Sequence, residues 1–230
     1  MDKENGLQED INGVVDWCET WSMSLNAAKC KVMHCGKNNP KKVYWIGDTP
    51  LKVTEREKDL GVIITSNGKF SEQAAAAVCK ANRILGVMRK TFRYFDIRLF
   101  KIIYPTFVRP HLEFASAVWN SLSVKDIKRI EGVQHRATKM VTELRGMDYN
   151  LRLKKLGLTT LETRRKRGDL IQIFKIVKGL EEVDLGVKIG RDRPGLSHTH
   201  QIVRDNCGKY PLRGDFLHER PPPGIYCPLR

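Results

Sequence analysis

The sequence predicts an α+β fold that is mostly helical, with a small antiparallel β part near the N-terminus followed by a helical bundle. Three observations predict it. Apolar residues recur at helical spacing over the first 25 positions, short β-like runs separated by turns occupy positions 29–65, and helical spacing returns from 71 to about 180. With 230 residues, of which 41% are hydrophobic, the chain can bury a core without disulfides or bound metal.

The first segment is predicted to be an amphipathic helix. Its apolar residues are separated by four, three, four, three and four positions: Leu7, Ile11, Val14, Cys18, Trp21 and Leu25. Because Trp21 belongs to this stripe, we expect it in the core, with Trp17 at the edge of the stripe.

The β part is predicted from four short runs. Runs 29–35, 43–46 and 51–54 are separated by turn residues and favour two hairpins. Run 60–65 is apolar and β-branched, which is typical of a buried strand.

The helical part begins at Ser71, a candidate N-cap. The apolar side of this helix carries Ala74, Ala77, Val78, Ala81, Leu85 and Met88. The next helix starts near Ile97 and carries Phe100, Ile103, Tyr104 and Phe107. Pro105 and Pro110 are expected to kink or break it, because proline lacks a backbone donor.

Three further helices follow. The first has an apolar face formed by Ile127, Ile130, Val133, Ala137, Met140 and Val141. The second is short, contains Leu151, Leu153 and Leu156, and is capped by Gly157. Thr159 and Glu162 form a capping-box pattern that opens the third, with Leu170, Phe174 and Val177 on one side. Glycines and prolines then predict a poorly ordered tail, 181–230.

Composition excludes several classes of protein. No apolar run approaches the roughly 20 residues that span a bilayer, and the first residues lack the basic and apolar regions of a secretory signal. We therefore expect an intracellular chain without membrane contact, and six free cysteine thiols.

The charge predicts a polyanionic partner, RNA or DNA. The chain has 41 Lys and Arg against 26 Asp and Glu, a net charge of +15. Positions 1–20 have a balance of −5, whereas 71–101 and 143–178 have +5 and +6. Solvated helix faces are the alternative interpretation of these cations, but uncompensated clusters favour phosphate binding.

Motifs for common catalytic chemistry are absent from the sequence. It has no GxxxxGK[ST] loop, no GxGxxG after a strand, no G-x-S-x-G and no H-E-x-x-H. The spacing of His198, His200, Cys207 and Cys227 is too loose to predict zinc, so no metal site is expected.

The order of motifs over about 7–180 resembles the C-terminal half of a LINE-type (non-LTR) retrotransposon reverse transcriptase of the jockey-like kind. The resemblance is carried by 7–11 with Trp17 and Trp21, 25–33, 57–64, 80–86, 108–115, Val118-Trp119, 134–139, 152–158, 161–165 and 168–170. It implies part of a right-hand polymerase: a palm remnant with primer-grip-like strands (1–66), thumb-like helices (67–145), basic post-thumb helices (146–180) and the tail (181–230).

The resemblance also implies site residues. Lys29 is the candidate general acid for the pyrophosphate leaving group, provided that a catalytic palm is supplied, and Leu60, Gly61 and Val62 correspond to the primer grip. The expected contacts to nucleic-acid phosphates are Arg83, Arg89, Lys90, Arg93, Arg109, Lys128, Arg129, Arg136, Lys139, Arg164, Arg165, Lys166 and Arg167.

The family's two Mg²⁺-binding aspartates have no counterpart here, because the sequence contains no Asp-Asp pair; the family's motif would lie upstream of Met1. The leading interpretation is therefore a polymerase fragment that binds a template–primer duplex of RNA and DNA through its backbone, holds no cofactor and does not polymerise alone. The alternatives are a non-enzymatic intracellular interaction module derived from a retroelement, and a decayed product without function.

Overall fold

A computed structural model describes residues 6–36, 39–120, 122–182, 189–190 and 201–202. The chain divides into two compact units, Met1–Lys69 and Phe70–Arg230, which we call the N-terminal unit and the helical unit. Most of the described residues lie in helices and a small share lies in short strands, which confirms the mostly helical α+β class. The finer division at 145 and 180 stays a prediction.

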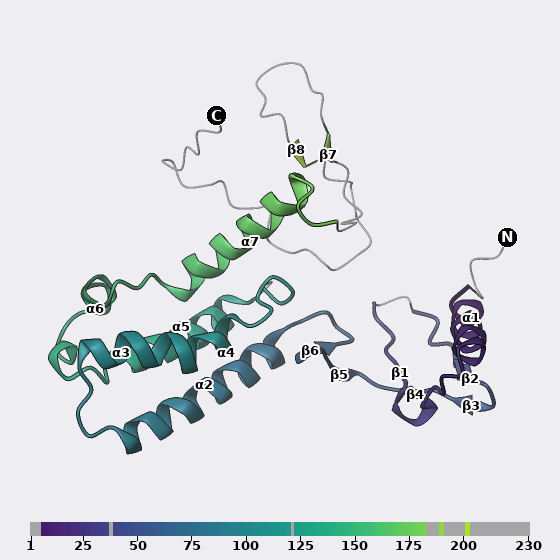
Figure 1. Cartoon of the computed structure of the whole chain (residues 1–230), viewed down its shortest axis with the longest axis horizontal. Helices are drawn as coiled ribbons and strands as arrows, with labels where there is room; N and C mark the ends of the chain where they lie inside the picture. Colours follow the sequence, from purple (N-terminus) through teal and green to yellow (C-terminus); the bar gives the residue numbers. More distant parts are fainter. Residues whose placement is uncertain (1–5, 37–38, 121, 183–188, 191–200, 203–230) are drawn as a thin grey trace. The chain divides into compact units, whose positions relative to one another are not determined.

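The N-terminal unit joins one helix to short strand pairs (Figure 1). Its elements are α1 (Gly6–Thr20), a 3₁₀ helix (Ala27–Lys29), β1 (Lys31–Val32), β2 (Trp45–Ile46), β3 (Thr49–Pro50), β4 (Lys52–Val53), β5 (Arg56–Asp59) and β6 (Val62–Thr65). The Gln8 side chain attaches α1 to β2, because its amide both donates to the Trp45 carbonyl and accepts from the Trp45 N–H, each at 3.0 Å.

The predicted core stripe of α1 is wrong in this unit. The helix ends at Thr20, short of Leu25, and Cys18 is its one buried described residue. Trp21, expected in the core, is 65% exposed, and Trp17 is 55% exposed. The physical reason is that two-residue strands form no sheet face wide enough to cover a helix.

The strand pairing also differs from the prediction. β2 and β3 form a hairpin, but β1 pairs with β4 in parallel, in place of an antiparallel hairpin. β5 and β6 form a second hairpin whose two-residue turn is Leu60-Gly61, with φ of +43° and +89°. The buried strand predicted at 60 therefore begins at Val62, because positive φ at both turn positions ends the strand geometry.

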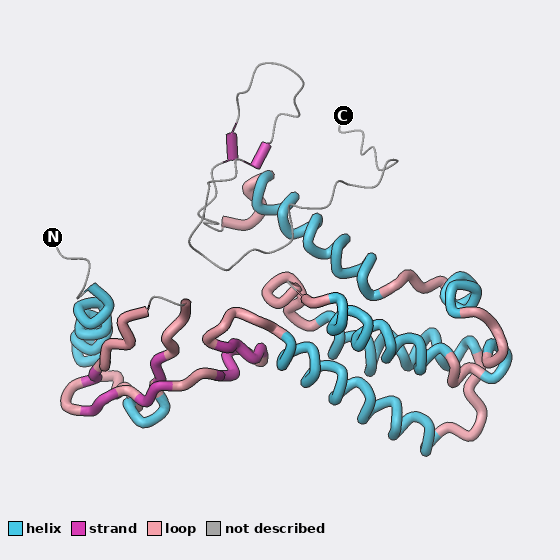
Figure 2. Tube along the Cα trace, turned by 180° about the vertical axis from the view of Figure 1, so that it is seen from behind, coloured by secondary structure: helices cyan, strands magenta, loops and turns pink. Residues whose placement is uncertain are grey.

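The helical unit is a bundle in which α2 packs along α5 and α4 (Figures 1 and 2). Its helices are α2 (Ser71–Thr91), α3 (Ile97–Ile103), a π-helical turn (Tyr104–Val108), α4 (Arg109–Glu113), α5 (Val124–Thr138), a 3₁₀ turn (Thr142–Leu144), α6 (Tyr149–Leu156) and α7 (Leu161–Val177). β7 (Ile189–Gly190) pairs with β8 (Gln201–Ile202). Of the predicted tail, 181–230, the structure describes only these two strands and residues 181–182; the rest lies outside the described residues.

The apolar side predicted for α2 is confirmed in its main positions. Ala74, Ala77, Ala81, Leu85 and Met88 are all buried. Opposite them, α5 buries Ile130, Val133 and Ala137. The small alanines let the two helices approach closely, so the core of this unit is built around the α2–α5 pair.

Two helix starts differ from the predictions by one residue. Ser71 is the first residue of α2 and donates to Asp126 Oδ2 at 2.6 Å, whereas the N-cap position belongs to Phe70. The cap of α7 is Thr160, whose hydroxyl accepts from the Thr163 N–H, and Thr159 lies outside it. Pro105 does interrupt the regular helix, and Gly157 does cap α6 in the left-handed conformation.

Candidate nucleic-acid interface

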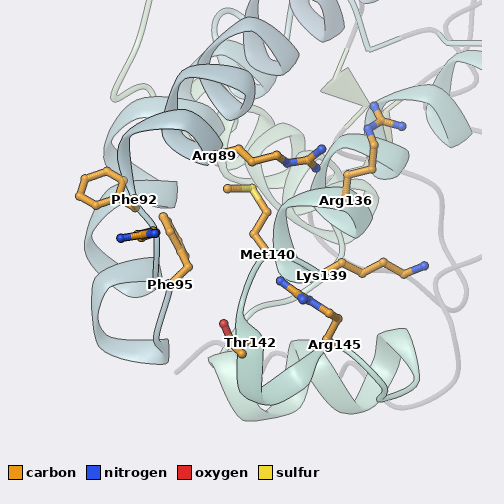
Figure 3. A pocket seen from close by; sticks show the side chains of 9 residues that line it. Arg89, Phe92, Phe95, Arg136, Lys139, Met140, Thr142 and Arg145 are labelled. Atoms are coloured by element: carbon orange, nitrogen blue, oxygen red, sulfur yellow. The ribbon is translucent and has the colours of Figure 1, made fainter.

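A basic pocket of about 420 Å³ lies in the helical unit, where the C-terminal ends of α2 and α5 meet (Figure 3). We call it the basic pocket. It is lined by Arg89, Phe92, Arg93, Phe95, Arg136, Lys139, Met140, Thr142 and Arg145. Five of these nine side chains are cationic and none is acidic. Such a lining favours an anionic ligand, because five cations in one pocket repel one another until an anion is bound.

The helix directions explain why cations collect here. Ser71 at the start of α2 contacts Asp126 at the start of α5, so the two helices run in the same direction. Their last turns carry Arg89 and Arg136. Cations are favoured at helix C-termini, where the macrodipole is negative. Two such ends side by side therefore concentrate basic side chains at one place.

Two hydrogen bonds fix the geometry of the walls. The Thr142 N–H donates to the Phe95 carbonyl at 3.1 Å, which ties the segment after α2 to the segment after α5. Arg136 Nη2 donates to Asn82 Oδ1 at 3.0 Å across the two helices. The five cationic side chains stay exposed, and a ligand in solution can reach them.

The neighbouring His135 reports the positive potential of this region. Burial is the first cause that lowers its pKa, and the nearby charges of Arg152, Lys139 and Arg136 lower it further. Like charges disfavour protonation of an imidazole. Asp148 raises the pKa and offsets part of this effect, so positive charges outweigh the negative one around His135.

The structure brings four of the predicted phosphate contacts into the basic pocket: Arg89, Arg93, Arg136 and Lys139. Lys90 and Arg83 are exposed on α2 and Lys128 is exposed on α5, all outside the lining. Arg129 pairs with Asp126 at 3.5 Å, and the half-buried Arg109 lies 3.7 Å from Glu113.

The basic run 164–167 at the start of α7 does not form one phosphate-binding surface. Arg164 binds Glu113 at 2.5 Å, Lys166 pairs with Glu162 at 3.2 Å, and Arg167 is exposed. The prediction that Arg165 contacts a phosphate is wrong, because its side chain is buried and only 5% exposed. Helical periodicity places it on the buried face with Leu161 and Asp169.

Arg165 is held inside the unit by an aromatic ring. Its guanidinium carbon lies 3.9 Å from the centroid of Trp119, which is fully buried. Burial lowers the pKa of Arg165 to about 10. The side chain is a packing element of the α7 contact and not part of the candidate interface.

Arg145 is the cation that the sequence prediction missed, together with the apolar lining residues Phe92, Phe95 and Met140. Arg145 stands after the 3₁₀ turn and belongs to no helical stripe. The local sequence carries no signal for it, because Arg145 reaches the pocket only through the packing of α2 beside α5.

The candidate residues of the N-terminal unit lie at two separate places, the 3₁₀ helix and the β5–β6 hairpin. Lys29 is exposed at the end of its 3₁₀ helix, where its N–H donates to Asn26 Oδ1 at 3.2 Å. Leu60 and Gly61 form the β5–β6 turn, and Val62 is buried. Among the described residues, no group of three or more His, Cys, Asp or Glu side chains is placed to hold a metal ion. Within the same residues, no helix is both long enough and apolar enough to cross a bilayer.

The sequence is similar to a curated protein of Drosophila melanogaster, "Probable RNA-directed DNA polymerase from transposon X-element". The two are 22% identical over 150 residues, which cover 61% of this chain and 16% of that protein. The chain thus matches a small part of its relative's length. No family model matches the sequence, and no solved structure matches it. The similarity supports a relation to the reverse transcriptases of transposable elements.

Proposed function

We propose that the chain is a fragment of a LINE-type, jockey-like retrotransposon reverse transcriptase whose helical unit binds the phosphate backbone of RNA and DNA without sequence preference. The basic pocket is the observation that carries the proposal, because five cations line it without an acidic side chain. Arg83, Lys90 and Lys128 are also exposed on α2 and α5 and add to the positive charge of these two helices. The similar Drosophila protein is a probable RNA-directed DNA polymerase, which supports the same class of ligand.

We further propose that this chain does not polymerise DNA alone. Phosphoryl transfer by such enzymes depends on Mg²⁺ held by carboxylates, and the sequence contains no Asp-Asp pair. Lys29 would act as a general acid, and Leu60, Gly61 and Val62 as a primer grip, only where a catalytic palm is supplied. A primer-extension assay with Mg²⁺ tests this, and any template-dependent extension by the purified chain contradicts it.

Salt dependence of binding tests the backbone contact directly. The logarithm of the association constant should fall with the logarithm of salt concentration, with a slope of about −0.9 per phosphate neutralised on B-form DNA. The triple variant Arg93→Gln, Lys139→Gln, Arg145→Gln should reduce the magnitude of this slope by about two to three. The matched control changes three exposed lysines outside the pocket lining: Lys101→Gln, Lys125→Gln and Lys154→Gln.

The two variants lose the same charge, so a general loss of attraction would affect both equally. A pocket that binds phosphate predicts a smaller slope only for the pocket variant. Binding that is independent of salt, or equal slopes for the two variants, contradicts the proposal.

A further inference from the structure

The basic pocket combines its cations with an apolar wall. In Figure 3, Phe92 and Phe95 lie on one side, Arg136, Lys139 and Arg145 on the other, with Met140 between them. Its volume of about 420 Å³ falls within the roughly 300–1,000 Å³ of small-ligand sites. A single phosphate group would leave most of this volume empty. The lining therefore suits a ligand that carries both negative charge and a flat apolar group.

Phe92 is the aromatic residue that such a group can reach. It is half-buried at the end of α2, where its backbone N–H donates to the Met88 carbonyl at 2.9 Å. Its ring meets Phe95 edge to face, with centroids 5.7 Å apart and planes at 80°. Phe95 is itself buried and packs edge to face against Phe100. Among the described residues, no aromatic ring stacks on Phe92 in parallel.

An unpaired nucleotide matches this lining better than a duplex does. In a double helix the bases are stacked inside, and the phosphates lie on a convex surface that can reach exposed cations but not a wall inside a pocket. An unpaired nucleotide presents its phosphates and the face of its base together. Base–aromatic stacking is also tolerant of sequence, since every base has a π-face.

We propose that the basic pocket binds an unpaired nucleotide of single-stranded RNA or DNA. The cations contact its flanking phosphates, and its base packs on Phe92 beside Met140. This inference rests on the proposed function, because it names the form of nucleic acid that the same pocket accepts. It adds that affinity depends on the bases as well as on the backbone.

Three probes of equal length separate these contributions for the full chain: an oligothymidine strand, an abasic strand with the same phosphates, and a blunt duplex. The oligothymidine should bind about tenfold more tightly than the abasic strand, since one stacked base on an aromatic side chain contributes about that factor. It should also bind more tightly than the duplex.

Substitution of Phe92 locates the effect. Phe92→Leu keeps apolar volume but removes the ring, and should weaken oligothymidine binding about tenfold while leaving abasic binding unchanged. Phe92→Tyr keeps the ring and should retain the affinity. The control is Tyr94→Leu, which removes an aromatic ring that is 60% exposed and lies outside the pocket lining, and should have no effect.

The outcomes distinguish the two proposals. Equal binding of the oligothymidine and the abasic strand, or tighter binding of the duplex, overturns the unpaired-nucleotide inference while salt-dependent binding keeps the proposed function. Loss of salt-dependent binding to all three probes overturns both. Because the probe comparison uses the unchanged chain, it decides the question even if Phe92→Leu fails to fold.

Discussion

The N-terminal unit and the helical unit carry similar hydrophobic patterns but bury them very differently. In the first, Cys18, Leu51 and Val62 are the buried apolar residues among those described. In the second, α2 and α5 alone bury eight. The spacing of apolar residues in the sequence shows only which face of a helix could be buried. Burial also needs a second face of matching length, which the 21-residue α2 finds in the 15-residue α5 and which α1 does not find in two-residue strands.

The comparison extends to aromatic residues. The ring centroids of Trp17 and Trp21 lie 6.4 Å apart, and both side chains of this pair in the N-terminal unit are exposed. The rings of Phe100 and Tyr104 stack inside the helical unit with their centroids 5.0 Å apart, and both side chains are almost fully buried. Aromatic side chains therefore stabilise the core of the helical unit, whereas those of α1 in the N-terminal unit are exposed.

The largest difference is expected from truncating one aromatic residue in each unit. Phe100→Ala removes a ring that is 1% exposed and should lower the free energy of unfolding of the helical unit by about 3–5 kcal/mol. Trp21→Ala removes a larger but exposed ring and should change the free energy of unfolding of the N-terminal unit by less than about 0.5 kcal/mol. Urea unfolding followed by circular dichroism measures both values. A loss with Trp21→Ala as large as that with Phe100→Ala would mean that the α1 stripe is covered in solution.

The helical unit also buries charge, and this makes its stability depend on pH. Asp169 is 4% exposed, and burial raises its pKa to about 6, although the Asn120 hydrogen bond and the Arg165 charge act in the opposite direction. The pKa is about 4 in the unfolded chain. This carboxyl therefore stabilises the fold most below pH 4, and the contribution is lost as pH rises through 6.

The variant Asp169→Asn isolates that contribution. Relative to the variant, the unchanged protein should lose about 2 kcal/mol of unfolding free energy between pH 4 and pH 7. Taking the difference removes effects common to both proteins, including that of Asp126, whose pKa is held low and which acts in the opposite direction. Urea unfolding at several pH values measures the difference. A difference that is constant from pH 4 to pH 7 would show that Asp169 has an ordinary pKa in the folded protein.

Much of the helical unit was predictable from sequence because its periodicity and its packing agree. The apolar side of α2, the interruption at Pro105 and the Gly157 cap all follow from local rules. The predicted apolar side of α7 failed: Leu170 and Phe174 are exposed, whereas Arg165 and Asp169 are buried. No local rule predicts that Trp119, 46 positions earlier in the chain, covers an arginine.

The candidate interface was predictable in part. Four of its cations were named from the family resemblance, and two of them lie where the sequence predicts a helix: Arg136 in the last turn of α5 and Lys139 at its C-cap. Arg145 and Phe92 join the pocket only because α2 and α5 run in the same direction and end together, which is a tertiary fact. The placement of Leu60 was also not predictable, because an apolar run does not show that its first two residues form a hairpin turn.

The smallest expected effect reverses the usual rule that removing a hydrophobic residue destabilises. Leu60 is 89% exposed and has a φ of +43°, a conformation that favours asparagine or glycine over leucine. Leu60→Asn should therefore stabilise the β5–β6 hairpin by about 0.5–1 kcal/mol. Leu60→Ile is the matched control, because it keeps the size but adds β-branching and should destabilise the hairpin. Amide hydrogen exchange at Lys58 and Ile63, which pair across the hairpin, measures both changes. Slower exchange in the isoleucine variant than in the asparagine variant would mean that the exposed side chain, and not the backbone conformation, stabilises this turn.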